Sequence, residues 1–121
     1  MSGRFIKAAV IYFLIGTIVG LVMGISEQFK YTSVHAHINL LGWASLAIIG
    51  VVYKAFPEAG QSKLATIQYW LHMIGLPLLI ISMIIFTTEH VKVGIPFASL
   101  GGLMIIVSVL LMTVNVFKRV K

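Results

Sequence analysis

The chain has 121 residues, of which 60% are hydrophobic and only 10% are charged, and its mean hydropathy is +1.05. Because a soluble domain carries about 25% charged residues, this composition excludes a soluble globular protein and predicts an integral membrane protein solvated by lipid. The absence of cysteine excludes disulfides and thiolate metal sites, and we attribute the net charge of +6 to basic ends of membrane spans, not to nucleic-acid binding.

Four apolar runs predict membrane-spanning helices at about 5–25, 34–55, 65–87 and 95–117. Each run is close to the roughly 20 residues that a helix needs to cross a bilayer. None shows the period-two alternation of a membrane β-barrel. The sequence therefore predicts an all-α fold, an integral membrane four-helix bundle, with residues 1–121 forming a single transmembrane domain.

Proline and glycine mark expected boundaries and contacts of these helices. Pro57 is expected to stop the second helix, Pro96 to lie in the first turn of the fourth, and Pro77 to kink the third. Small residues let helices approach closely in lipid. The first helix carries a stripe of them at Gly16, Gly20 and Gly24. Such a stripe predicts packing within the chain or a contact between protomers.

The basic residues predict an orientation. Seven lie at the N-terminus, in the middle loop and at the C-terminus, namely Arg4, Lys7, Lys54, Lys63, Lys118, Arg119 and Lys121. Only Lys30 and Lys92 lie in the other two loops. The positive-inside rule then predicts a multi-pass protein of the bacterial inner (cytoplasmic) membrane with both termini in the cytoplasm.

The second helix begins with two histidines, His35 and His37, near the outer surface. Residues two apart on a helix differ by about 200°, so these imidazoles should point to opposite sides and serve two sites. Asn39, Gly42 and Trp43 follow them, and the small residues should leave room for a flat ligand such as a porphyrin. Neutral imidazole binds haem iron and copper. The alternative is that both histidines are polar caps at the membrane interface.

Two further histidines lie apart from this pair. His72, in the third helix, should lie on the order of 15 Å from His37 in depth, as a core histidine bonded to Tyr69, Trp70 or a carbonyl, or as a cofactor ligand. His90 should lie at the outer rim, as a solvated loop residue or as a partner of haem propionates. The three carboxylates, Glu27, Glu58 and Glu89, all lie in predicted loops.

The stretch "VHAHINLLGWASLAIIGVVYKAFP", with "YWLHMIGLPLLI" and "NVFKRV", resembles small four-helix bacterial membrane proteins related to subunit I of the haem–copper oxidases, a family that includes nitric oxide reductases. The resemblance implies one four-helix arc of a homotrimeric twelve-helix ring, with His35 and His37 of neighbouring chains around haem. The chain departs from the oxidases in having no adjacent histidine pair and no His–Tyr constellation at cross-linking spacing.

The leading hypothesis is a haem b-binding membrane protein for electron transfer or for binding a diatomic gas (NO or O2). The alternative is a copper- or haem-handling accessory or assembly protein for a respiratory oxidase, in which the outer HxH pair passes a metal such as copper onward. A third is an assembly protein without a cofactor. An enzyme, here an oxidoreductase related to the haem–copper oxidases, is least favoured because acid–base groups are scarce. Expected partners are membrane lipid, further copies of the chain and a respiratory-chain redox protein, but no nucleic acid.

Overall fold

The computed structural model describes residues 1–121, which form helices almost throughout and no strand. The elements are α1 (Ser2–Ser26), η1 (Phe29–Tyr31), α2 (Thr32–His37), the π-helix η2 (Ile38–Ala44), α3 (Ser45–Ala55), α4 (Pro57–Gly60), α5 (Lys63–Phe86) and α6 (Val91–Arg119). Four helical segments are long and apolar enough to cross a membrane, with η1 to α3 running as one segment over Phe29–Ala55. The predicted all-α fold with four apolar spans is confirmed.

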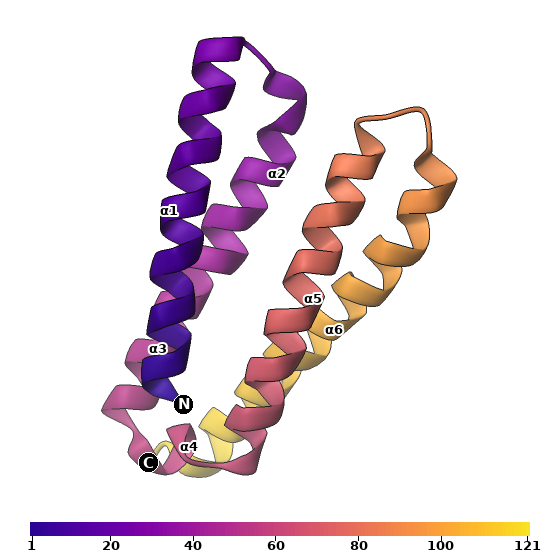
Figure 1. Cartoon of the computed structure of the whole chain (residues 1–121). Helices are drawn as coiled ribbons and strands as arrows, with labels where there is room; N and C mark the ends of the chain where they lie inside the picture. The colour runs from indigo at the N-terminus through magenta and orange to yellow at the C-terminus, as the bar shows by residue number, and fades with distance from the viewer.

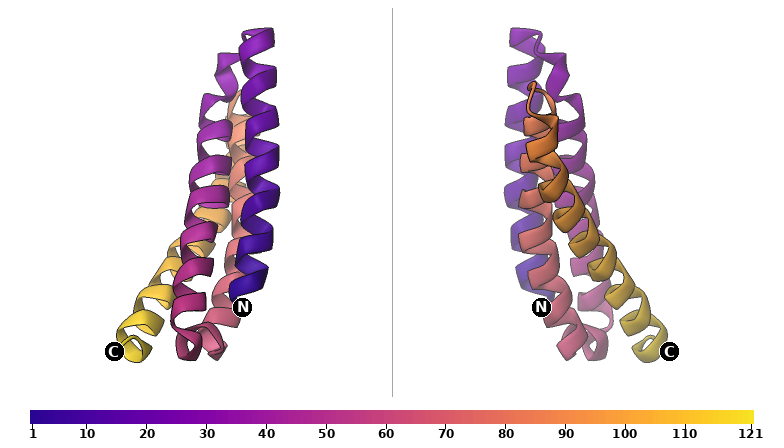
Figure 2. Two further views of the ribbon diagram at one scale, coloured as in Figure 1. Left: turned by 90° about the vertical axis from the view of Figure 1, so that its left-hand side faces the viewer. Right: turned by 90° about the vertical axis from the view of Figure 1, so that its right-hand side faces the viewer.

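The helices form two antiparallel hairpins joined by α4 (Figure 1). The first hairpin pairs α1 with the segment from η1 to α3, and the second pairs α5 with α6, which crosses α5 obliquely (Figure 2). Both termini and α4 lie at one end, called the proximal end below, and the loops after α1 and α5 lie at the distal end. The hairpins are joined by α4 at the proximal end (Figure 1), and toward the distal end the second span still contacts α5 through α2.

The helix ends differ from the predicted ones where proline is concerned. The second span ends at Ala55, and Pro57 occupies the first turn of α4, so it begins a short helix as well as ending a long one. Pro96 lies inside α6, which already begins at Val91, so its predicted place in the first turn is wrong. A transmembrane helix tolerates such a proline because neighbouring groups can bond the freed carbonyl. Pro77 lies within an unbroken α5.

The glycines are explained by packing within the chain at most positions. A Cβ at Gly101 of α6 would come within 2.7 Å of the main-chain oxygen of Gly75 on α5, so the two backbones approach directly. Gly16 and Gly20 of α1 lie against side chains of the second span. Gly24 and Gly102 face open space. The predicted glycine stripe of α1 therefore packs within the chain over two of its three members.

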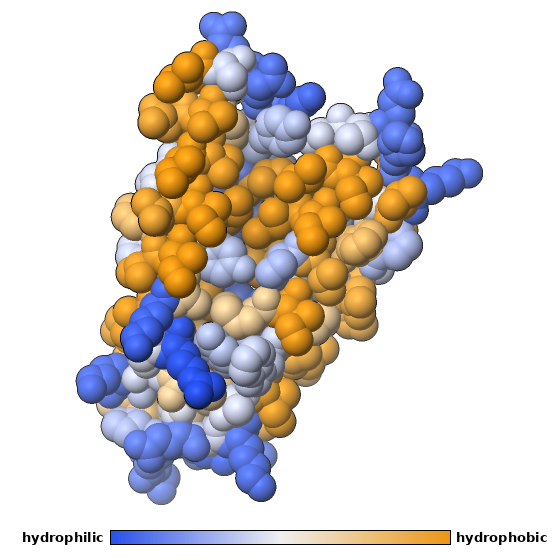
Figure 3. All heavy atoms as spheres, viewed as in Figure 1, coloured by the Kyte–Doolittle hydropathy of each residue, from blue (hydrophilic) through white to orange (hydrophobic).

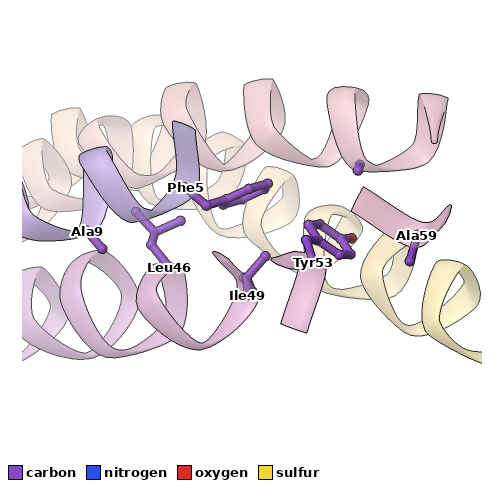
Figure 4. Packing of buried hydrophobic residues seen from close by; sticks show 7 residues of the cluster. Phe5, Ala9, Leu46, Ile49, Tyr53 and Ala59 are labelled. Atoms are coloured by element: carbon purple, nitrogen blue, oxygen red, sulfur yellow. The ribbon is translucent and has the colours of Figure 1, made fainter. Parts of the chain in front are cut away.

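A compact apolar cluster holds the proximal end together (Figure 4). Its members come from α1, α3, α4 and α5 and are Phe5, Ala9, Leu46, Ile49, Tyr53, Ala59 and Ala65. The ring of Phe5 meets Tyr53 and Tyr69 edge to face, at centroid distances of 5.6 and 5.2 Å. Phe5 thus links α1 to α3 within the first hairpin and to α5 of the second.

The molecule exposes most of its apolar surface. Only 25 of the 121 residues are buried, and hydrophilic residues gather at the two ends of an apolar belt (Figure 3). Such a surface is suited to lipid and not to water. Because the helices are antiparallel, the seven basic residues of the termini and middle loop share the proximal end.

Candidate functional site

His35 lies in the first hairpin, with its ring against α1. Its Nδ1 is 2.9 Å from the carbonyl oxygen of Gly16, and a Cβ at Gly20 would lie 2.7 Å from its Cε1. A carbonyl only accepts hydrogen bonds, so Nδ1 carries the proton and donates it. The amide nitrogen of Asn39, 3.2 Å from that ring nitrogen, donates to the main-chain oxygen of His35 at 3.0 Å. Nε2 of His35 therefore keeps a free lone pair.

His37 has the same arrangement with a different partner. Its Nδ1 donates to the carbonyl of Ser33, one turn earlier, at 2.9 Å. The Ser33 hydroxyl in turn donates to the sulfur of Met83 on α5 at 3.7 Å, so this face of α2 is turned toward the second hairpin. Nε2 of His37 makes no hydrogen bond. Both histidines are only partly buried, and in the neutral ring each would present Nε2 as the nitrogen that can bind a metal.

The two imidazoles diverge because the helix is regular where they lie. α2 is an ordinary α-helix from Thr32 to His37, so residues two apart point about 200° apart. His35 contacts α1, and His37 shares its face with Ser33, which contacts α5. No three histidine or carboxylate side chains converge within one chain. A single chain can thus offer two separate imidazole ligands, but no chelating cluster.

The other predicted site residues of the second span pack against α1. The Gly42 backbone lies on the ring of Tyr12, and the side chain of Asn39 lies on Gly16. Trp43 stacks on Phe13, with ring centroids 4.5 Å apart and planes 25° apart. The room expected beside Gly42 for a flat ligand is therefore filled by Tyr12, since sequence alone did not show which neighbour covers that face.

A π-helical stretch, Ile38–Ala44, follows directly after His37. The main-chain N–H of Ser45 bonds to the carbonyl of Leu40, five residues back, where an α-helix would use Leu41. The Ser45 hydroxyl donates to the same Leu40 oxygen at 2.7 Å. The carbonyl of Leu41 is thereby released from its α-helical partner. Sequence reasoning treated this span as one regular helix and missed the feature.

His72 forms a hydrogen bond with the released Leu41 carbonyl. Nε2 of His72 donates to the Leu41 oxygen at 2.8 Å, across the seam between the hairpins. The expectation that His72 bonds a carbonyl is met, with Leu41 as the partner. Leu41 follows His37 by only four residues, about 6 Å along a helix, so the His72 ring lies closer in depth to the histidine pair than the 15 Å expected.

His90 lies apart from the other three histidines. It precedes α6 in the distal loop of the second hairpin and is exposed. Its main-chain N–H donates to the Thr88 hydroxyl at 3.2 Å, and its ring lies 3.5 Å from that oxygen. The structure brings His90 into no shared group with the pair on α2.

Sequence reasoning also missed a buried polar network at the proximal end. Asn115 of α6 donates to the Tyr53 hydroxyl at 3.1 Å and to the carbonyl of Ala59 at 2.9 Å. The Tyr53 hydroxyl donates to Oε1 of Gln68. Amide side chains inside apolar spans are the signal that was available, because polar groups in a membrane are rare and require partners.

Comparison with known proteins gives no further identification. No protein-family model, no curated protein and no solved structure matches this chain.

Proposed function

We propose that this protein is a haem b-binding integral membrane protein that transfers electrons or binds a diatomic gas such as NO or O2. The observation that carries the proposal is the state of the two distal imidazoles. Each fixes Nδ1–H on a main-chain carbonyl and leaves Nε2 free. Metal-ligating histidines usually hold their second nitrogen in this way, which sets the ring orientation and raises ligand basicity.

Haem suits this pair better than a bare metal ion does. A copper or zinc site generally needs three or more protein ligands, and no group of three is present in one chain. Haem iron needs only one or two axial imidazoles. Bound haem would supply a one-electron iron couple, or a gas-binding position if the sixth site stays open. Exposed apolar side chains beside α2, such as that of Leu40, would supply a dry surface for the macrocycle.

The same divergence favours a site shared between chains. His35 and His37 of one chain point apart, so a second protein ligand on the same iron would have to come from another copy. We propose a homotrimer in the bacterial inner membrane, in which His35 and His37 of neighbouring chains flank haem. Native mass spectrometry in mild detergent tests this: a trimer is expected, and a strictly monomeric protein would overturn the shared site.

The haem proposal is tested by the absorption spectrum of protein expressed with haem and copper supplied and purified in mild detergent. A Soret band is expected in the wild type and should be lost in both His35→Ala and His37→Ala. Thr17→Ala is the matched control, since Thr17 lies on α1 between the two contacted glycines and bonds only carbonyls of its own helix, at 2.9 Å.

Two other outcomes would count against haem. A colourless protein with stoichiometric copper would support the alternative function, a copper-handling accessory protein for a respiratory oxidase. A protein with neither group would leave the histidines as interface caps and the chain as an assembly protein without a cofactor.

A further inference from the structure

Two buried polar atoms in α5 have no hydrogen-bond partner. They are Nε2 of Gln68 and Nδ1 of His72, and both side chains are fully buried, with 0% exposure. The residues are four apart, so they lie on one face of α5 with Cβ atoms about 6 Å apart. Buried polar groups in proteins are almost always satisfied. Two unsatisfied atoms on adjacent turns of one face therefore point to something bound between them.

The hydrogen bonds on the Gln68 side fix what its amide can offer. Arg119 donates to Oδ1 of Asn115 at 2.8 Å, and the Asn115 amide donates to the Tyr53 hydroxyl at 3.1 Å. The Tyr53 hydroxyl then donates to Oε1 of Gln68. In each of these three hydrogen bonds the donor lies on the Arg119 side and the acceptor on the Gln68 side. Gln68 has thus used its oxygen as an acceptor, and its free Nε2 can only donate.

The bond on the other side fixes what His72 can offer. Nε2–H of His72 donates to the Leu41 carbonyl at 2.8 Å. In the neutral ring the remaining nitrogen, Nδ1, is then an acceptor. Of the two unpartnered atoms, Nε2 of Gln68 is therefore a donor and Nδ1 of His72 an acceptor.

We propose that a single buried water binds between Gln68 and His72, accepting from Nε2–H of Gln68 and donating to Nδ1 of His72. A cation cannot accept from the amide, and an anion without hydrogen cannot donate to the imidazole. Gln68 and His72 line none of the five main grooves of the molecule, and both side chains are fully buried, so the site suits a ligand no larger than water. Water supplies both roles and needs only a few polar partners.

This water completes a polar chain that joins the two hairpins. The chain runs from Arg119 through Asn115, Tyr53, Gln68, the water and His72 to the Leu41 carbonyl. Tyr53 and Leu41 belong to the first hairpin, and the others belong to the second. The chain thereby connects the proximal end to the π-helical stretch below His37. None of its links depends on haem.

The test is NMR of the full-length protein in lipid nanodiscs with isotope-labelled histidine, the His72 signal being assigned by its loss in His72→Gln. We expect His72 to carry its proton on Nε2 and to show magnetisation transfer from water to its ring protons. Gln68→Met, which keeps the side-chain length but removes the donor, should abolish that transfer. Ser82→Ala is the matched control, because this buried serine of α5 bonds only the Leu79 carbonyl of its own helix, at 2.5 Å.

Three results would overturn the water site. The first is a wild-type His72 protonated on Nδ1, which would need an acceptor and not a donor. The second is the absence of water transfer in the wild type, as expected for a direct bond between Gln68 and His72. The third is unchanged transfer in Gln68→Met. The first two are read from the wild-type protein once its His72 signal is assigned, so they do not depend on Gln68→Met folding, and neither requires haem.

Discussion

At the proximal end, the amide, hydroxyl and guanidinium groups between the hairpins bond one another in a network around Asn115. At the distal end, His35 and His37 each use one ring nitrogen on a main-chain carbonyl and leave the other free. The hairpins are joined by α4 at the first end (Figure 1), and toward the second end α2 lies against α5.

This contrast separates two uses of polar side chains in a membrane. Hydrophobic burial does not drive helices together in lipid, so interhelical hydrogen bonds and close packing must hold the bundle. The proximal network has that role, since Asn115 is fully buried and bonds groups of α3, α4 and α6. Polar groups that stay unsatisfied and partly accessible do nothing for stability and are candidates for binding. The following changes should act on one end and spare the other.

The largest effect is expected from Asn115→Leu. Asn115 is fully buried and serves Tyr53, Ala59, Ser62 and Arg119, so its removal leaves several groups unpaired. We expect a loss of about 2–3 kcal/mol in the free energy of unfolding, measured by titration into a denaturing detergent. Thr113→Ala is the control, because that exposed hydroxyl bonds only Val109 of its own helix. An equal loss in the two variants would contradict the role given to the network.

Gly101→Ala should have the next largest effect. The new Cβ would lie 2.7 Å from the main-chain oxygen of Gly75 and 2.7 Å from the main-chain nitrogen of Leu79, so α5 and α6 must move apart. Gly102→Ala is a matched control, since it gains the same helix propensity but meets nothing within 4 Å. We expect Gly101→Ala to be less stable than the control by about 2 kcal/mol in the same titration. Similar stabilities would show that the second hairpin is loosely packed.

The sequence predicted the spans and the divergence of the two histidines, but not the local helix geometry or the packing between helices. Apolar length decides which segments span a bilayer, so the four helices were predicted, and the divergence of His35 and His37 followed because α2 is regular. The π-helical stretch was not predictable from hydropathy, since Ile38–Ala44 is as apolar as an α-helical span. Nor could sequence show that Tyr12 fills the space at Gly42, because that depends on which faces meet.

Gly20→Ala should act on the distal end. Its Cβ would lie 2.7 Å from Cε1 of His35, and the partly buried ring can shift to relieve the clash. We expect stability close to that of the wild type but haem binding about tenfold weaker, equivalent to about 1.4 kcal/mol, measured by haem titration of the apoprotein. Gly24→Ala, one turn further along α1 and facing open space, should bind haem as the wild type does. Equal haem affinities in the two variants would show that His35 is not part of the haem site.

Phe13→Leu should have the smallest effect. The stacked pair of Phe13 and Trp43 contributes about 0.5–1.5 kcal/mol beyond its area, and leucine keeps the apolar bulk, so we expect a loss of about 1 kcal/mol in the detergent titration. Phe117→Leu is the control, since Phe117 is 85% exposed. Removing a contact inside the first hairpin should not change how the hairpins meet. A loss as large as that of Asn115→Leu would mean that aromatic packing within the first hairpin holds the bundle as firmly as the proximal network does.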